Sequence, residues 1–336
     1  MRQAMLYTSG DGYAQCGLCA HRCRIGEEQR GICRVRENRG GELYSLVYGK
    51  VAAEHIDPVE KKPLFHVFPG SLSYSIATRG CNFRCLHCQN ASISQIGVDD
   101  DPGRFCATRT PEEVISSALA GGCRTISYTY VEPTVFFEFA YDCCRLAVRE
   151  NISNIFVSNG YMTEQATRLL APVLTAINID IKSFRDDFYR KVCGARLQPV
   201  LDTVRLMHEL GVWVELTTLL IPGKNDSREE LRDIAVFIAG IDRSIPWHVT
   251  AFYPTYKMLE QPRTPRETLE KAREIGLAAG LHHVYEGNIP GSGGENTCCP
   301  SCGAEVIRRR GFSIIKNNLR DGKCPGCSAV VAGVWR

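Results

Sequence analysis

The chain has 336 residues, enough for about two domains, with 44% hydrophobic and 23% charged residues, which is typical of a folded globular protein. Forty basic and 37 acidic residues give a formal charge of +3, too balanced for a protein dedicated to nucleic acid or a membrane surface. No apolar run reaches the roughly 18 residues of a membrane span.

Seventeen cysteines are an unusually large number for a chain of this composition. An odd count fits poorly with a closed disulfide framework, and the first residues contain no apolar stretch of signal-peptide length. The cysteines are instead grouped at metal-ligand spacings. We therefore expect a reduced, cytoplasmic protein whose thiolates bind metal.

The first 50 residues form a predicted cysteine-rich, metal-binding segment. It contains Cys16, Cys19, Cys23 and Cys33, a complete set of four ligands that predicts a closed site. All-thiolate ligation suits zinc and an iron–sulfur cluster, so both remain open, with zinc the preferred interpretation. A strand-like run over 42–53 follows, and the prolines of 55–71 favour an irregular connector.

From residue 72 onward, short apolar runs alternate with amphipathic ones, and 51–290 is the predicted main domain. Alternating strands and helices imply parallel pairing, and this many units predict a full or partial (β/α) barrel. The expected strands are 72–79, 125–130, 154–159, 176–182, 212–221, 246–253 and 282–286. The expected helices are 111–120, 134–150, 163–171, 198–210, 227–239 and 265–280, with caps at Thr110 and Thr264.

A Gly/Ser-rich linker at 289–297 leads to a predicted C-terminal module over 291–336. Its ligands are Cys299, Cys302, Cys324 and Cys327, in a CxxC–x21–CxxC pattern close to that of a zinc ribbon. An auxiliary iron–sulfur cluster is the alternative. Arginines 308–310 favour a solvated or partner-facing edge over a nucleic-acid contact, so we expect no nucleic-acid partner.

Cys81-x3-Cys85-x2-Cys88 follows the first strand of the predicted barrel, where the loops of such barrels carry chemistry. Three thiolates bind three irons of a cubane cluster and leave the fourth iron open. An open metal position is typical of a reactive site, whereas structural sites are closed. The alternative is a zinc site completed by a ligand such as His87.

This motif, placed after the first strand of a barrel, resembles the radical S-adenosylmethionine (SAM) superfamily. The resemblance implies a [4Fe–4S] cluster whose open iron is chelated by SAM. One-electron reduction then yields methionine and a 5′-deoxyadenosyl radical, which abstracts a hydrogen atom from a substrate. His87 stands where the superfamily usually has an aromatic residue against the adenine.

A narrower resemblance rests on EKKPLFHVFPGS, YTYVEPTVFFEFAYD, DIKSF, GVWVELTTLLIPGKND and IPWHVTAFYP, among other runs. These runs closely resemble the radical SAM enzymes of the AmmeMemoRadiSam system, which are related to pyruvate formate-lyase activating enzyme. The resemblance implies Memo-like and Amme-like protein partners and an electron donor of the flavodoxin or ferredoxin type. It does not identify a substrate.

The same resemblance assigns further residues to the SAM site. Glu132 stands in the place of a Gly-Gly-Glu-Pro glutamate that meets the SAM amino group, although Tyr130 and Val131 replace both glycines. Ser158 and Asn159 match one layer of the site, and Asp180 and Lys182 match the methionyl end. His248 matches a histidine of the sixth strand. The alternative for Asp180 and Lys182 is an ordinary interior ion pair, and the alternative for His248 is a core histidine.

The sequence thus predicts a radical SAM enzyme that abstracts hydrogen from an unidentified substrate, and the candidate substrate is a protein of a Memo/Amme system. Installation of a glycyl radical in a partner enzyme is the alternative reaction. A metal-bound adaptor without catalysis is the alternative of a different class, and the intact cysteines argue against it. The remaining cysteines are predicted to be small buried apolar residues: Cys106, Cys123, Cys143, Cys144, Cys193 and Cys298.

Overall fold

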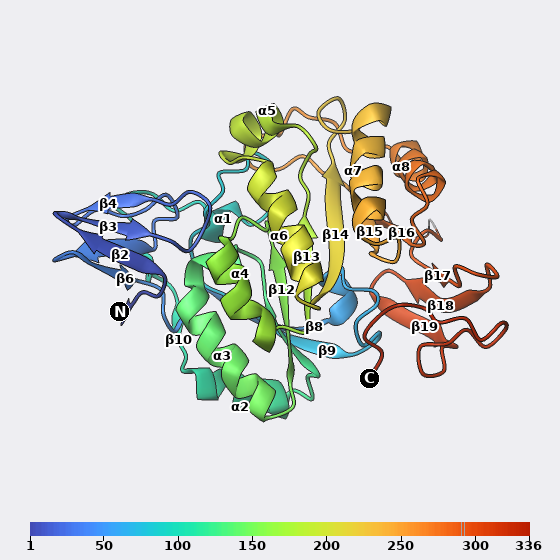
Figure 1. The fold of residues 1–336 in the computed structure, drawn as a ribbon, viewed down its shortest axis with the longest axis horizontal. Helices are drawn as coiled ribbons and strands as arrows, with labels where there is room; N and C mark the ends of the chain where they lie inside the picture. Colours follow the sequence, from blue (N-terminus) through green and yellow to red (C-terminus); the bar gives the residue numbers. More distant parts are fainter. Residues whose placement is uncertain (290, 292) are drawn as a thin grey trace.

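The computed structural model describes residues 1–289, 291 and 293–336, and an eight-stranded sheet lies at its centre (Figure 1). The strand order is β16-β15-β14-β13-β12-β11-β9-β8, and every pair from β9 to β16 is parallel. The sheet therefore grows in chain order, and the predicted partial barrel is confirmed. The strands are β8 (Ala53–Pro58), β9 (Leu72–Ala77), β11 (Thr125–Tyr128), β12 (Ser153–Ser158), β13 (Ala176–Asp180), β14 (Trp213–Leu220), β15 (Trp247–Ala251) and β16 (Val284–Gly287).

Helices connect the parallel strands and cover the sheet, as Figure 1 shows. Helix α3 packs against β12, α6 against β14 and α8 against β15. The alternation predicted from the sequence is confirmed, with boundaries that differ by a few residues. The principal helices are α2 (Pro111–Ala120), α3 (Phe137–Arg149), α4 (Glu164–Leu170), α6 (Gln198–Glu209), α7 (Arg228–Ile241) and α8 (Arg266–Ala278), with short α1 (Ala91–Ser94) and α5 (Asp186–Phe188).

The two predicted helix caps have different outcomes. Thr110 caps α2 in a capping box with Glu113, and Pro111 occupies the first turn. The cap predicted at Thr264 is wrong, because no side chain caps α8. Thr264 Oγ1 instead donates to the carbonyl oxygen of Leu220 at 2.6 Å and accepts from the amide of Phe252 at 2.8 Å. The hydroxyl therefore joins the ends of β14 and β15.

The connector predicted over 55–71 is partly wrong, since its first residues belong to β8. This strand pairs antiparallel with β9 at the edge of the sheet. Pro58 is its last residue, a position where a missing amide hydrogen disrupts no central ladder. A 3-10 turn, η1 (Val59–Lys61), follows.

Smaller sheets lie at the two ends of the molecule (Figure 1). The N-terminal part contains β1-β6-β5 and β2-β3-β4, and β7 pairs with β10. The C-terminal part is the sheet β17-β18-β19. The predicted boundary at residue 290 and part of the predicted linker lie outside the described residues. The bounds are β1 (Arg2–Gln3), β2 (Tyr7–Gly10), β3 (Tyr13–Cys16), β4 (Arg24–Gly26), β5 (Arg36–Arg39), β6 (Glu42–Ser45), β7 (Lys50–Val51), β10 (Ala107–Thr108), β17 (Thr297–Cys298), β18 (Glu305–Arg310) and β19 (Ser313–Asn317).

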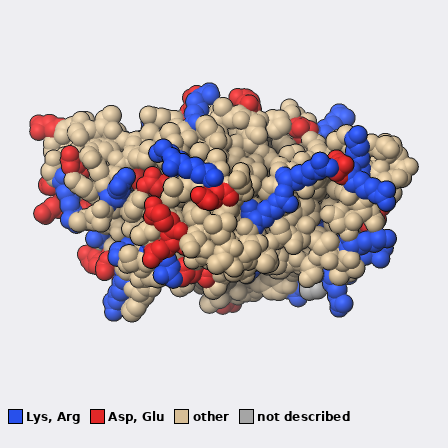
Figure 2. Space-filling view, turned by 90° about the horizontal axis from the view of Figure 1, so that it is seen from below, with Lys and Arg blue, Asp and Glu red and all other residues tan. Residues whose placement is uncertain are grey.

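The surface carries both signs of charge. On the face in Figure 2, lysine and arginine side chains are interspersed with acidic ones, and basic side chains predominate toward the C-terminal end. In the described part of the chain, no helix combines the length and the apolar character needed to cross a bilayer.

Candidate active site

A cavity of about 310 Å³ lies where the parallel strands end and the loop after β9 folds over them. Its volume falls in the range of small-molecule sites, which is about 300–1,000 Å³. The loop contributes sulfur atoms and the strand ends contribute charged and polar groups. The lining includes most of the residues that the sequence assigns to a SAM site: Cys81, Cys85, His87, Cys88, Glu132, Ser158, Asn159, Asp180 and Lys182.

The three clustered cysteines share one wall of the cavity. Cys81 and Cys85 are buried and Cys88 is partly buried. The backbone amide of Phe83 donates to Cys81 Sγ at 3.4 Å, and Cys88 Sγ lies 3.1 Å from Ser94 Oγ. Burial, followed by the nearby Glu132 carboxylate, raises the pKa of Cys81 well above its ordinary value. A thiolate at this position is favoured only when a positive charge such as a metal compensates it, and the all-sulfur donor set fits an iron–sulfur cluster.

Glu132 lies at the centre of a hydrogen-bond network beneath the cysteines. Its Oε1 accepts from the Thr134 amide at 3.0 Å, Thr134 Oγ1 at 2.5 Å and Ser158 Oγ at 2.8 Å. Its Oε2 accepts from the Asn159 amide at 2.7 Å. Burial raises the pKa of Glu132, while these hydrogen bonds act in the opposite direction. Oε2 retains acceptor capacity, because among the described residues only the Asn159 amide donates to it.

Asp180 and Lys182 form an ion pair at the end of β13. Lys182 Nζ lies 2.7 Å from Asp180 Oδ2. Burial acts to lower the pKa of Lys182, but the Asp180 carboxylate, together with the nearby Cys85 and Cys193, outweighs it and the pKa is raised. The ammonium therefore stays charged on the cavity wall. The structure shows the interior ion pair that was the alternative for these two residues, and their contact with SAM stays a prediction.

His87 stands between the second and third cysteines and is almost fully buried. Burial, followed by the positive charge of Lys182, lowers its pKa to about 3, so the imidazole is neutral. No donor or acceptor in the described part of the chain reaches its Nδ1. A neutral ring on the cavity wall is available for stacking.

His248 lies away from this cavity. Its Nε2 is 2.6 Å from Glu215 Oε2, and its ring packs edge-on against Phe65 with centroids 4.8 Å apart. Glu215 is fully buried and also accepts from the amides of Phe65 and His66. The sequence did not indicate that Glu215 would compete for this histidine, and Thr250 occupies the cavity wall from the same strand.

Two further features of the site concern Cys193 and the conformation of Tyr130. Cys193 ends the π-helical turn η4 (Tyr189–Cys193). A hydrogen bond with Cys193, followed by burial, raises the pKa of Cys85 well above its ordinary value. Tyr130 has φ +62°, the left-handed region that glycine favours, at the place where related enzymes have glycine. Its hydroxyl donates to Asp57, which also pairs with Lys62 at 2.6 Å. The sequence offered no signal for Cys193, whose partner is distant in the chain.

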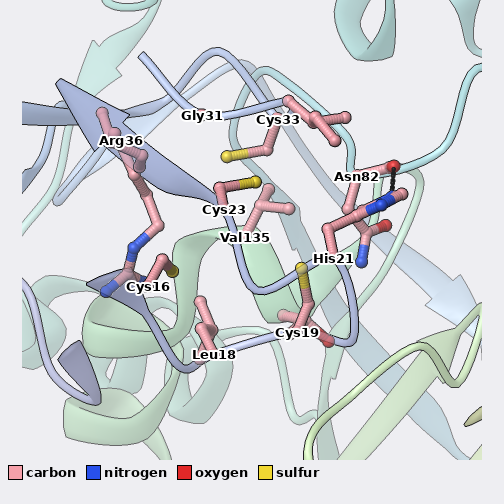
Figure 3. A pocket seen from close by; sticks show the side chains of 13 residues that line it. Cys16, Leu18, Cys19, His21, Cys23, Gly31, Cys33, Arg36, Asn82 and Val135 are labelled. Atoms are coloured by element: carbon pink, nitrogen blue, oxygen red, sulfur yellow. Dashed lines mark hydrogen bonds between the residues drawn. The ribbon is translucent and has the colours of Figure 1, made fainter. Parts of the chain in front are cut away.

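The two other cysteine quartets lie outside this cavity. The C-terminal sulfur atoms of Cys299, Cys302, Cys324 and Cys327 all lie within 4.8 Å of one another. The Cys299–Cys327 and Cys302–Cys324 sulfur pairs are 3.6 and 3.7 Å apart. A single zinc with bonds of about 2.3 Å places tetrahedral ligands about 3.8 Å apart, so this geometry fits one metal ion. The N-terminal quartet lines a separate pocket next to the cysteine loop (Figure 3).

Comparison with known proteins agrees with this geometry. A family profile described as the Radical SAM superfamily matches residues 75–237. The uncharacterized protein MJ0808 of Methanocaldococcus jannaschii is 46% identical over 331 residues, which cover 97% of this chain and 98% of that protein. The pyruvate formate-lyase-activating enzyme of Clostridium pasteurianum is 23% identical, covering 62% of this chain and 89% of that enzyme.

A solved structure shares the fold. A radical SAM methyltransferase from Sphaerobacter thermophilus superposes with a TM-score of 0.52 at 16% identity, covering 66% of this chain and 68% of that one. At this identity the likeness concerns the arrangement of the strands and helices only.

Proposed function

Because the chain belongs to the radical SAM superfamily, we propose that it cleaves SAM reductively in the cavity lined by Cys81, Cys85 and Cys88 and abstracts hydrogen from a second molecule. The observation that carries this proposal is the meeting of three thiols and a charged pair, Asp180 and Lys182, in one cavity of ligand size. A structural metal site would have no use for either the open volume or the charged groups.

The three cysteines would hold a [4Fe–4S] cluster with one iron free of protein ligands. When bound, such a cluster supplies the electron for reductive cleavage of SAM and the open iron that fixes the amino acid part of SAM. The charged groups on the cavity wall would then orient SAM.

Two charged groups of the cavity, Lys182 and Glu132, have matching groups on SAM. Lys182 can donate to the SAM carboxylate, and Oε2 of Glu132 can accept from its ammonium. Asp180 holds Lys182 in position through the 2.7 Å contact. His87 offers a neutral ring to the adenine. Ser158 and Asn159 fix the Glu132 carboxylate through their hydroxyl and amide donors.

We assign the reaction to a protein substrate of a Memo/Amme system, in the cytoplasm, with a flavodoxin or ferredoxin as electron donor and zinc at the C-terminal quartet. The motif resemblance supports these partners, and the sulfur separations of 3.6 and 3.7 Å support zinc. Glycyl-radical installation is the second candidate, favoured by the similarity to a pyruvate formate-lyase-activating enzyme.

The test is release of 5′-deoxyadenosine from SAM by the anaerobically reconstituted protein with dithionite. The wild type should release it and Cys85→Ala should not, because two thiolates cannot hold the cubane with its open iron. Cys106→Ala is the matched control, since this partly buried cysteine lies in a loop outside the cavity. Equal release by wild type and Cys85→Ala would refute the proposal.

A further inference from the structure

The four N-terminal cysteines line one small pocket that the proposed reaction does not use. Figure 3 shows the side chains of Cys16, Cys19, Cys23 and Cys33 around a single space, with apolar groups such as Leu18 and Val135 between them. They come from β3, from the loop before β4 and from the segment before β5. The fold thus brings together ligands separated by up to 17 residues.

The spread of these sulfur atoms differs from that of the C-terminal quartet. One zinc ion requires four sulfurs about 3.8 Å apart, and the C-terminal quartet meets this condition. The N-terminal sulfurs form no comparable group of three within 4.8 Å among the described residues. A cubane cluster binds each thiolate through a different iron, so its four sulfurs stand farther apart than those around a single ion.

A buried cation faces the same pocket. Arg36 lines it, is 1% exposed and pairs with Glu138 at 3.0 Å. Its Nε and Nη1 have no hydrogen-bond partner in the described part of the chain. Buried donors are expensive to leave unpaired, and a cluster with four thiolates offers sulfur acceptors and a negative charge. The pocket therefore contains both the ligands and a counter-charge.

The N-terminal pocket and the SAM cavity share a wall. Asn82 and Thr134 line the pocket, while Cys81, next to Asn82, and Glu132, two residues before Thr134, line the cavity. His21 Nε2 lies 2.8 Å from the Asn82 carbonyl oxygen, and Asn159 Nδ2 donates to Asn82 Oδ1 at 2.7 Å. Asn82 therefore contacts residues of both sites, and metal groups bound in the two sites would be neighbours.

From these observations we propose that Cys16, Cys19, Cys23 and Cys33 bind a second [4Fe–4S] cluster. This assignment reverses the preference for zinc that the spacing alone favoured. All four irons would have protein ligands, so the cluster has no open position for SAM. Its position beside the cysteine loop places it within reach of electron exchange with the first cluster.

The test measures iron, sulfide and zinc in anaerobically reconstituted protein, with EPR spectra of the reduced samples. The wild type should contain about eight irons and one zinc. Cys81→Ala/Cys85→Ala/Cys88→Ala leaves the N-terminal segment intact and should retain about four irons, with an EPR signal that SAM does not alter. Cys16→Ala/Cys33→Ala should retain about four irons and a signal that SAM does alter.

The outcomes separate this inference from the proposed function. A wild type with about four irons and two zincs, together with a triple variant free of iron, would overturn the second cluster and leave the SAM site standing. Conversely, about four irons retained by the triple variant, without SAM cleavage by the wild type, would uphold the second cluster alone. Cys106→Ala is the control for cysteine loss in general and should keep the metal content of the wild type.

Discussion

Removal of the Glu132 carboxylate should destabilise the folded protein and not only the binding of SAM. Four donors converge on this side chain, and two of them are the backbone amides of Thr134 and Asn159. The hydroxyls of Thr134 and Ser158 can rotate toward other acceptors when the carboxylate is absent. The amides cannot, because Thr134 belongs to the short helix η2 (Pro133–Phe136), which Glu132 caps, and Asn159 directly follows strand β12, so the backbone fixes the direction of both.

The size of the effect follows from these two amides. A hydrogen bond to a charged group contributes about 1.5–3 kcal/mol, so their loss costs about 3–6 kcal/mol. Burial of the carboxylate is itself unfavourable, as its raised pKa indicates, and its removal recovers part of that cost. We therefore expect Glu132→Ala to lower the free energy of unfolding by about 3 kcal/mol, near the lower bound.

Thermal unfolding followed by circular dichroism measures this change. At roughly 2 °C per kcal/mol for a chain of this size, the midpoint should fall by about 6 °C. The midpoint of Glu132→Gln should fall less, because the side-chain oxygen of glutamine still accepts hydrogen bonds and its NH₂ group faces only the Asn159 amide. Glu164→Gln, on an exposed side chain, is the control and should leave the midpoint unchanged. An unchanged midpoint in Glu132→Ala would refute this reasoning.

Three further outcomes follow from other parts of the structure. Lys182→Met should weaken SAM binding about 30-fold or more, and Asp180→Asn should weaken it less, as measured by calorimetry on proteins of equal iron content. If both variants bound SAM as tightly as the wild type, the charged pair would not belong to the site. Burial lowers the pKa of His283 to about 3, below its ordinary 6.5. The contribution of this neutral histidine to the free energy of unfolding should therefore be complete above pH 6.5 and should be lost as the pH drops toward 3. Between pH 7 and 5, the free energy of unfolding measured with urea should therefore fall by about 2 kcal/mol less in His283→Phe than in the wild type. An equal fall in both proteins would contradict this. Cys302→Ala/Cys327→Ala should lose about one zinc, keep its iron and become sensitive to proteolysis at the C-terminal end; full zinc retention would count against that site.

The fold was largely predictable because local signals determine it. The strands from β9 to β16 are short apolar runs, and the helices between them carry a clear apolar face, so their order followed directly from the sequence. The edge strand β8 was missed because Pro58 suggested an irregular segment, although a strand end tolerates proline.

Local spacing predicted the site only where its residues are close in sequence, whereas Glu132, Asp180 and Lys182 were assigned through the resemblance to a known family. The spacing of Cys81, Cys85 and Cys88 predicted their shared wall, since one loop carries all three. The engagement of His248 by Glu215 and the approach of Cys193 to Cys85 depend on contacts between distant segments. No local pattern encodes such contacts, because the register of neighbouring strands and the path of long loops determine them.

The central claim is an iron with an open coordination position in the cavity of Cys81, Cys85 and Cys88, and electron–nuclear double resonance tests it most directly. The reduced protein would be measured with SAM labelled at its amino nitrogen and carboxylate oxygen, in the wild type and in Lys182→Met at saturating SAM. Direct ligation predicts hyperfine coupling of both labelled atoms to the cluster in the wild type. A spectrum without coupling, under conditions where SAM is shown to be bound, would contradict the account.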